Sequence, residues 1–252
     1  MKNFDTLFIA NRGEIALRIL RTAQKLGLRT VVGYSDADSW TPAVKQADKA
    51  VRLGAGPVGE SYLNQEAVIN AARAAGAQAI HPGYGLLSEN SAFARAVTAA
   101  GLIWVGPAPD SMDRVASKSR AKEVAERAGV PTVPGHRGDQ SPERFRAAAA
   151  GMGYPVLLKA TAGGGGRGIR LVQNESELLS SMELARGEAL NAFGDGELLL
   201  EKYVPRAHHV EVQVFGDHHG QVIHLGERDC SAQRRNQKVI EEAPSPLLDE
   251  AT

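Results

Sequence analysis

The sequence has a single cysteine, no excess of either charge and no long apolar run. Cys230 alone cannot form a disulfide within the chain, which excludes a disulfide-stapled domain and favours a reducing compartment. Lys+Arg and Asp+Glu both number 29, so charge gives no support to nucleic acid or a membrane surface as the main partner. No apolar stretch reaches the length of a membrane-spanning helix.

What is present is the composition of a globular protein. The chain has 252 residues, 43% of them hydrophobic and 23% charged, which is enough for two domains with real cores. Strand-like sequence begins at Leu7, with only Met1–Thr6 before it. We therefore expect no signal or transit peptide and a cytoplasmic location.

The segment Tyr154–Val172 carries the strongest local signal. Two short apolar runs, Val156–Leu158 and Ile169–Val172, predict two strands joined by a loop that is almost entirely glycine. Without Cβ atoms, such a loop can bring several backbone N–H groups close to an anion. Lys159 and Arg167 add positive charge beside these donors. The segment therefore predicts a hairpin that closes over polyphosphate as a lid.

Two familiar glycine motifs are excluded here. Gly163, Gly165 and Gly168 have the spacing of the dinucleotide fingerprint, but that fingerprint opens a helix, and Ile169–Val172 is typical of a strand. In the P-loop the lysine follows the last glycine, whereas Lys159 precedes the glycines. The remaining alternative is a surface hairpin that glycine merely makes flexible.

The N-terminal part alternates strands with helices, which predicts a doubly wound parallel sheet up to about residue 113. Helices are expected at Ile15–Leu26, Tyr62–Ala75 and from about Ser88 to Ala100. Four strands are expected: Leu7–Ala10, Arg29–Tyr34, Ala77–Ile80 and Leu102–Val105.

Ligands usually bind at the carboxyl ends of such strands. The loops Asn11–Glu14 and His81–Gly85 are therefore candidates for lining a cleft. The alternative for His81, Tyr84 and Glu89 is a tight turn before a helix with Ser88 as its N-cap. For Arg12 and Glu14 the alternative is a structural salt bridge or a subunit contact.

The C-terminal part mixes helices with antiparallel strands. A charged helix is expected at Ser117–Ala128, with Lys118 at its start; a lysine in this setting is usually solvated. A linker at Pro131–Gly138 follows. Further elements are helices from Ser141 to Ala150 and at Glu175–Leu190, a strand at Leu198–Leu200, a hairpin of Val210–Phe215 with Val222–Leu225, and a densely polar segment at Gly226–Lys238.

At this point the motifs identify a resemblance, to biotin carboxylase, the ATP-grasp component of biotin-dependent carboxylases. The most specific motif is Glu227–Ser231, followed by Gln233–Arg235 and Gln237–Lys238. The others match in order along the whole chain: Ile9–Ala16, His81–Asn90, Ala128–Pro131, Tyr154–Gly168, Leu200–Tyr203 and Glu241–Pro244.

The resemblance implies a domain plan and an activity. Residues 1–114 would form the Rossmann-like N-terminal domain, and residues 115–252 an α+β ATP-grasp domain. That domain would have a lid at about 131–203 and the truncated start of its C-terminal core at 204–252. The implied reaction is ATP- and bicarbonate-dependent carboxylation of biotin through carboxyphosphate, the first half-reaction of an acyl-CoA carboxylase. Implied cofactors are ATP, Mg²⁺ or Mn²⁺, and biotin. Implied partners are a biotin carboxyl carrier domain, a carboxyltransferase subunit and a second copy in a homodimer.

The resemblance also implies roles for individual residues. Lys118 and Lys159 would contact the ATP phosphates under the glycine lid, and Lys238 would act catalytically near the reacting phosphate and bicarbonate. Glu201 and Lys202, with the backbone through Val204, would hold the adenine, and His209 and Gln233 would reach the ribose. The lid glycines are Gly163, Gly164, Gly165, Gly166 and Gly168.

Two departures from the family pattern stand out. Position 236, often histidine, is Asn236, which keeps hydrogen-bonding capacity but cannot titrate, so we expect a tuned nucleotide contact. The chain also stops at about half the family's usual domain, before the expected acidic metal ligands, so no metal ligand is assigned and the chain alone is expected to be inactive. Salt bridges with nearby arginines are expected instead for Glu227, Asp229, Glu241 and Glu242.

Three other functions remain as alternatives. The first is another ATP-grasp ligase, such as the carbamoyl-phosphate synthetase large subunit. The second is a non-catalytic nucleotide-binding module. A nicotinamide-dependent dehydrogenase is the third and is disfavoured by the strand after Gly168.

Overall fold

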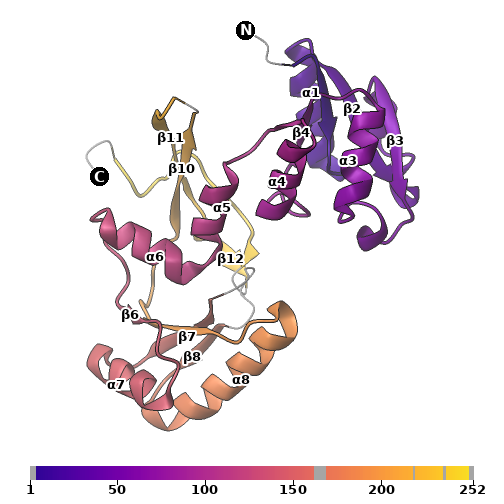
Figure 1. Ribbon diagram of the computed structural model, residues 1–252. Coiled ribbons are helices and arrows are strands. Elements are labelled where there is room, and N and C mark those ends of the chain that lie inside the picture. Colours follow the sequence, from indigo (N-terminus) through magenta and orange to yellow (C-terminus); the bar gives the residue numbers. More distant parts are fainter. Residues whose placement is uncertain (1–3, 162–168, 218, 235–236, 250–252) are drawn as a thin grey trace. The chain divides into compact units, whose positions relative to one another are not determined.

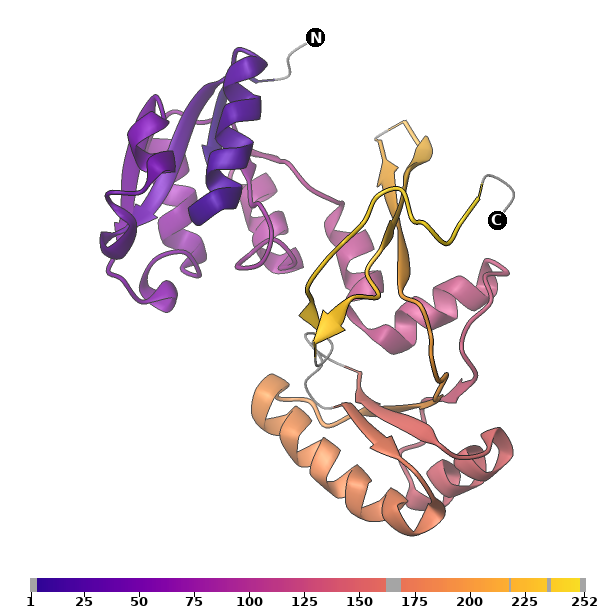
Figure 2. The same cartoon turned by 180° about the vertical axis from the view of Figure 1, so that it is seen from behind.

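The computed structural model describes residues 4–161, 169–217, 219–234 and 237–249. Contacts within the chain group it into two compact units, Met1–Asp113 and Arg114–Thr252. Figures 1 and 2 show the elements of each unit from opposite sides. Helix α5 (Pro109–Ala116) runs across the division.

The first unit is built on a five-stranded sheet in the order β3-β2-β1-β4-β5, and every pair is parallel. The chain leaves the central strand toward β2 and β3 and then returns to β4 and β5 on the other side. This reversal makes the ends of β1 and β4 the topological switch point. The strands are β1 (Thr6–Ile9), β2 (Arg29–Ser35), β3 (Lys49–Gly54), β4 (Ala79–His81) and β5 (Ile103–Trp104).

Two hydrophobic clusters cover the two faces of this sheet. Along β1, Leu7 and Ile9 pack in a cluster with Leu20 of α1, whereas Phe8 packs in the other with Phe93 of α4. Successive strand residues point to opposite faces, so burial of all three requires helices on both sides. The expected doubly wound sheet is therefore confirmed. Its helices are α1 (Gly13–Lys25), α2 (Pro42–Gln46), α3 (Gln65–Ala74) and α4 (Ser91–Ala99).

The sequence interpretation of this unit missed helix α2 and strand β3 and placed the cap of α4 at the wrong residue. Strand β3 was not expected, because its pattern Lys-Ala-Val-Arg-Leu-Gly mixes charge with apolar residues, as suits an edge strand. Helix α4 is capped by Asn90 rather than Ser88: the Asn90 side chain accepts a hydrogen bond from the Phe93 N–H at 2.8 Å.

The second unit contains the antiparallel sheet β6-β9-β7-β8. The predicted hairpin is confirmed, because β7 and β8 pair antiparallel with Lys159 opposite Ile169. The strands are β6 (Gly135–His136), β7 (Val156–Ala160), β8 (Ile169–Val172) and β9 (Leu198–Lys202), and the helices are α6 (Lys118–Arg127), α7 (Pro142–Met152) and α8 (Glu175–Phe193).

One face of this sheet packs on α7 and α8. Val156, Leu158 and Leu200 point to that face and are fully buried with Phe145 of α7 and Leu178 of α8. By strand alternation, Lys159 and Glu201 point to the opposite face. Folding the apolar face into the core therefore presents these two charged side chains together.

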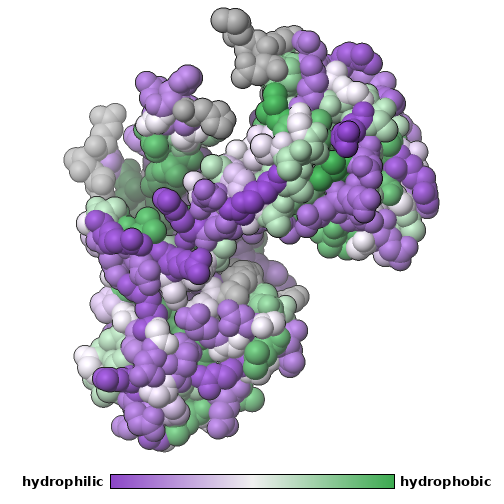
Figure 3. All heavy atoms as spheres, in the orientation of Figure 1, coloured by the Kyte–Doolittle hydropathy of each residue, from purple (hydrophilic) through white to green (hydrophobic). Residues whose placement is uncertain are grey.

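The last part of the chain forms a hairpin of β10 (Val210–Gly216) and β11 (Val222–Asp229), followed by the short strands β12 (Gln233–Arg234) and β13 (Gln237–Lys238). The hairpin is confirmed, but β11 extends to Asp229, so the polar segment predicted from Gly226 begins inside the strand. Figure 3 shows hydrophobic residues on the surface of this hairpin. The exposed apolar residues are Val212, Val214, Phe215, Val222, Ile223 and Leu225.

Candidate nucleotide-binding site

A group of lysines surrounds one carboxylate on the face of the β6–β9 sheet opposite α7 and α8. Lys159 of β7 pairs with Oε2 of Glu201 on β9 at 2.5 Å, and Lys122 of α6 pairs with Oε1 at 2.8 Å. At the start of α6, Lys118 Nζ donates to the Ala160 carbonyl at 3.3 Å, at the end of β7. We call Lys118, Lys122, Lys159 and Glu201 the lysine cluster.

Electrostatics within the lysine cluster favour an anionic ligand. Burial alone would raise the pKa of Glu201, but hydrogen bonds from Lys122 and Lys159 outweigh it and hold that pKa below its ordinary value. Burial, and then the nearby charge of Lys159, lower the pKa of Lys118, while Glu201 opposes the shift. Three cations facing one carboxylate leave a net positive site, which a polyphosphate would neutralise.

The structure thus brings Lys118 and Lys159 together, as the sequence interpretation required. Lys118 is half-buried against β7 rather than solvated on a charged helix. The predicted lid glycines, Gly163 to Gly166 and Gly168, lie outside the described residues.

Glu201 and Lys202 were expected to act together, but their side chains leave β9 on opposite faces. The Lys202 side chain donates to the Gly153 carbonyl at 2.8 Å, on the face that packs on α7 and α8. A contact from Lys202 to a ligand at the lysine cluster would therefore use its backbone. Val204 lies two residues after the end of β9 and is half-exposed.

His209 and Gln233 lie in direct contact. Gln233 Nε2 lies 2.7 Å from His209 Nδ1 and donates to the Cys230 carbonyl at 2.8 Å. The His209 backbone is fixed in turn, because its N–H donates to Ser231 Oγ and its carbonyl accepts from the Cys230 N–H. The two residues expected at a ribose are thus hydrogen-bonded to each other. Asn236 lies outside the described residues.

Lys238 belongs to a second charged group, which we call the Glu211 cluster. Lys238 and Arg228 both pair with Glu211, and both approach Glu241, at 3.6 and 3.9 Å. Hydrogen bonds from Lys238 and Arg228 lower the pKa of Glu211 to about 2, and the same bond raises the pKa of Lys238. Lys238 is therefore held as a cation.

Within the part of the chain that the structure describes, the salt bridges expected for four carboxylates are found for one of them. Glu241 approaches Arg228, as predicted. Glu227 and Asp229 instead accept backbone N–H groups, of Ser245 at 3.1 Å and Ser231 at 2.8 Å. The backbone of Glu242 pairs with that of Asp229 as an isolated bridge.

Among the described residues, Glu211, Glu241 and Cys230 are close enough to share a metal ion. This set does not fit Mg²⁺, which prefers oxygen ligands, because one member is a thiol. Both carboxylates also already face Lys238 and Arg228. No step of the chemistry is therefore assigned to a metal held by these three residues.

In the first unit, side-chain hydrogen bonds join the loops after β1 and β4. Asn11 Nδ2 donates to the carbonyls of Pro82 at 2.7 Å and Tyr84 at 2.8 Å, and the Tyr84 hydroxyl donates to Glu14. A Cβ at Gly83 would lie 2.6 Å from Asn11 Nδ2, so this approach requires glycine. Arg12 pairs with Asp38 at 3.6 Å, which fits the structural salt bridge.

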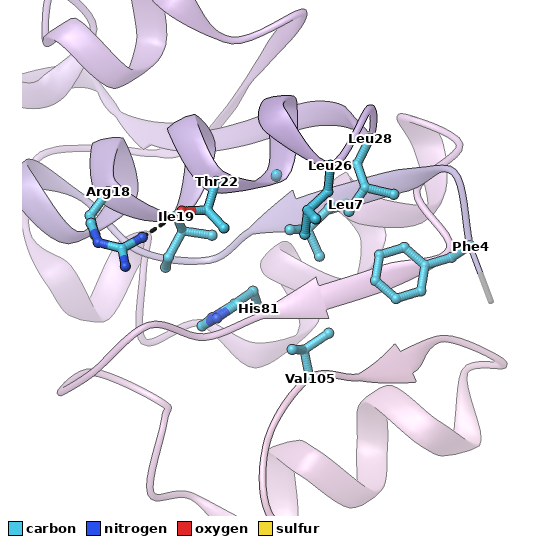
Figure 4. A pocket seen from close by; sticks show the side chains of 10 residues that line it. Phe4, Leu7, Arg18, Ile19, Thr22, Leu26, Leu28, His81 and Val105 are labelled. Carbon is cyan, nitrogen blue, oxygen red and sulfur yellow. Dashed lines mark hydrogen bonds between the residues drawn. The ribbon is translucent and has the colours of Figure 1, made fainter. Parts of the chain in front are cut away.

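His81, at the end of β4, lines a mainly apolar pocket of about 210 Å³ between α1 and the sheet (Figure 4). Burial lowers the pKa of His81, and its Nδ1 accepts the Gly83 N–H at 3.0 Å, so the neutral ring carries its proton on Nε2. Arg18 also lines the pocket, with its guanidinium hydrogen-bonded to Thr22. None of the predicted nucleotide-binding residues that the structure describes lines this pocket.

Comparison with known proteins decides the family. Residues 3–112 match the family described as "Biotin carboxylase, N-terminal domain", and residues 117–252 match "Carbamoyl-phosphate synthase L chain, ATP binding domain". The biotin carboxylase of Halalkalibacterium halodurans is 51% identical over 249 residues, which are 98% of this chain and 55% of that protein. The chain belongs to the biotin carboxylase family.

Solved structures of the biotin carboxylase family superpose closely on the chain. A biotin carboxylase from Campylobacter jejuni in complex with β,γ-ATP has a TM-score of 0.96 at 49% identity, covering 99% of this chain and 56% of that one. The biotin carboxylase domain dimer of Hydrogenobacter thermophilus 2-oxoglutarate carboxylase, in complex with MgADP, ADP and bicarbonate, has a TM-score of 0.94 at 50% identity. It is covered to 55%, and this chain to 100%.

Other family relatives are longer chains. The propionyl-CoA carboxylase alpha chain of Ruegeria pomeroyi is 49% identical over 251 residues, which are 99% of this chain and 37% of that protein. The chain thus spans between about a third and a little over half of the curated relatives that it matches. No helix among the described residues is long and apolar enough to cross a membrane.

Sequence reasoning missed Lys122, the second lysine that holds Glu201. A signal existed, because Lys122 follows Lys118 by four residues and therefore shares its helix face. It also missed Glu211, the carboxylate that holds Lys238. The alternation Val-Glu-Val-Gln-Val placed Glu211 on the polar face of β10 without indicating a partner.

Proposed function

We propose that the chain is the N-terminal part of a biotin carboxylase, which uses ATP and bicarbonate to carboxylate biotin on a carrier domain. The observation that carries this proposal is the lysine cluster, in which Lys118 and Lys159 meet at the end of β7, directly before the glycine segment. Membership of the biotin carboxylase family supports it. A structural relative that contains MgADP and bicarbonate supports the same substrates.

The proposed nucleotide site follows the surfaces around the lysine cluster. Lys118 and Lys159 would hold the phosphates, with Gly163 to Gly166 and Gly168 above them. Glu201, with the backbone from Lys202 to Val204, would hold the adenine. The paired side chains of His209 and Gln233 would reach the ribose, and Asn236 would adjust that contact. The proposed domain limits are 1–114 and 115–252, with a lid at 131–203.

Phosphoryl transfer from ATP to bicarbonate places negative charge on the transferring oxygens, so fixed cations supply most of the catalysis available to side chains. We assign this role to Lys238, which Glu211 keeps protonated. A lid closed over the site would exclude water from carboxyphosphate, which hydrolyses readily. Mg²⁺ would accompany the nucleotide and neutralise part of its charge, although Glu211, Cys230 and Glu241 do not fit it.

The proposed partners are those of a biotin-dependent carboxylase. Relatives named as subunits of acyl-CoA carboxylases, such as the propionyl-CoA carboxylase alpha chain, favour a carrier domain and a carboxyltransferase subunit. The dimeric structural relative favours a homodimer. The lone and buried thiol of Cys230 suits a reducing cytoplasm.

The test is an ATP-cleavage assay on the protein encoded by the complete reading frame. The proposal predicts ADP release that depends on both bicarbonate and biotin. Release that depends on bicarbonate and an ammonia donor, but not on biotin, would point to a carbamoyl-phosphate synthetase-like ligase. ATP binding without any turnover would point to a nucleotide-binding module. Residues 1–252 alone should bind ATP but carboxylate no biotin.

A further inference from the structure

Lys122 is held by two hydrogen bonds in the second unit. Its Nζ donates to the Val133 carbonyl at 2.6 Å and to Glu201 Oε1 at 2.8 Å. The Lys122 side chain is 14% exposed and that of Glu201 is 11% exposed. Removing one partner from an ion pair so shielded from water costs much more than removing one from a surface pair, because the remaining charge is left uncompensated.

The backbone of β6 packs closely against the Lys122–Glu201 ion pair. A Cβ on Gly135 would lie 2.5 Å from the Leu200 carbonyl, 3.3 Å from Lys122 Nζ and 3.4 Å from Glu201 Cγ. Gly135 therefore lets β6 pack directly against the pair. A side chain at position 135 would crowd the pair, whereas glycine leaves the two oxygens of Glu201 paired with Lys122 and Lys159.

The two oxygens of Glu201 thus have different partners. Lys122 holds Oε1 and contacts a backbone carbonyl, whereas Lys159 holds Oε2 at the end of β7, near Lys118. A polyphosphate that binds between Lys118 and Lys159 competes with Glu201 for Lys159. If Lys159 were its only cation, the departure of Lys159 would leave a shielded carboxylate unpaired, which is strongly unfavourable.

We propose that Lys122 is a positioning residue that keeps Glu201 paired and in place while Lys159 turns to a bound nucleotide. This inference rests on the proposed function, because it requires ATP to bind at Lys118 and Lys159. It goes beyond that function because it gives a role to a residue that touches no ligand. Lys122 allows Lys159 to leave Glu201 and contact phosphate.

The proposal is tested with a double-mutant cycle on the chain. Isothermal titration with ATP·Mg²⁺ compares the wild type, Lys122→Met, Glu201→Gln and the double variant. Lys122→Met should weaken ATP binding about tenfold, because Glu201 would then hold Lys159 alone. In the Glu201→Gln background the same change should alter affinity by less than about twofold, because no carboxylate competes for Lys159.

Matched variants separate positioning from folding. Lys122→Arg should restore affinity to within about threefold, since it keeps the charge near Glu201, and Arg120→Met, on an exposed part of α6, should leave it unchanged. If Lys122→Met does not fold, Lys122→Gln replaces it in the cycle, because its amide can still donate to Val133. Equal effects in both Glu201 backgrounds, or no effect, would overturn the proposal. Absence of ATP binding by the wild type would overturn the proposed function as well.

Discussion

Lys159 and Glu201 lie on adjacent antiparallel strands, two register positions apart and on the same face, and their side chains form an ion pair. The opposite face of both strands carries the buried apolar residues Val156, Leu158 and Leu200 and packs on α7 and α8. The same alternation that builds the core therefore places a lysine and its carboxylate where a nucleotide is proposed to bind. The expected effects on nucleotide binding rest on this ion pair and on the lysines beside it.

As pH rises, nucleotide affinity should begin to fall at a lower pH than it would if Lys118 had the pKa of an ordinary lysine. Burial and the charge of Lys159 lower the pKa of Lys118, while Glu201 opposes the shift. As pH rises through this lowered pKa, Lys118 loses its proton and its attraction for phosphate. ATP·Mg²⁺ titrations from about pH 7 to about pH 10 should show this loss.

Lys118→Arg is the matched control for this pH effect, because a guanidinium stays protonated throughout that range. Its affinity profile should be flatter than that of the wild type, with circular dichroism confirming that both chains remain folded. Identical profiles would mean that Lys118 does not hold the phosphate.

Lys238→Ala should impair chemistry more than binding. Glu211 holds Lys238 as a cation in a cluster that shares no described hydrogen bond or ion pair with Lys118, Lys122, Lys159 or Glu201. In the complete protein, bicarbonate-dependent ATP cleavage should fall about 100-fold or more, with ATP affinity changed less than about threefold. Lys45→Ala, on exposed α2, is the control. A loss confined to ATP binding would make Lys238 a nucleotide contact instead.

Two glycine substitutions should shift stability in opposite directions. At Gly135 a Cβ would meet the Leu200 carbonyl at 2.5 Å, so Gly135→Ala should destabilise the second unit by about 1–3 kcal/mol. At Gly151, in α7, a Cβ meets nothing within 4 Å, and Gly151→Ala should stabilise it by about 0.5–1 kcal/mol. Urea unfolding measures both changes in stability. Equal shifts would contradict the close packing of Gly135 against the Leu200 carbonyl and Lys122.

The elements of the fold that the sequence predicted are those that local pattern determines. The hairpin of β7 and β8 follows from two apolar runs around glycine, and the parallel sheet from alternating periods, because local pattern sets both. The edge strand β3 escaped notice because Lys49 and Arg52, two of its six residues, are charged and exposed and interrupt the apolar pattern. The cap of α4 was misplaced because Ser88 and Asn90 are both good N-caps.

The candidate site was predictable only in part. Lys159 stood out because it precedes a glycine run, whereas Lys122 resembles every other lysine on a charged helix. Its partner Glu201, on β9, lies 79 residues further along the chain, so no local pattern indicates that the two side chains meet. The opposite orientation of Lys202 follows from the extension of β9 to Lys202, whereas the expected strand Leu198–Leu200 ended before both residues.

The most direct test of the account is the affinity of the chain for ATP·Mg²⁺ before and after Lys159→Ala, measured by isothermal titration beside Lys49→Ala on an exposed position of β3. Loss of one charge-assisted contact to phosphate predicts affinity about 10- to 100-fold weaker for Lys159→Ala and unchanged for Lys49→Ala. Equal affinities for all three proteins would contradict a nucleotide site at the lysine cluster.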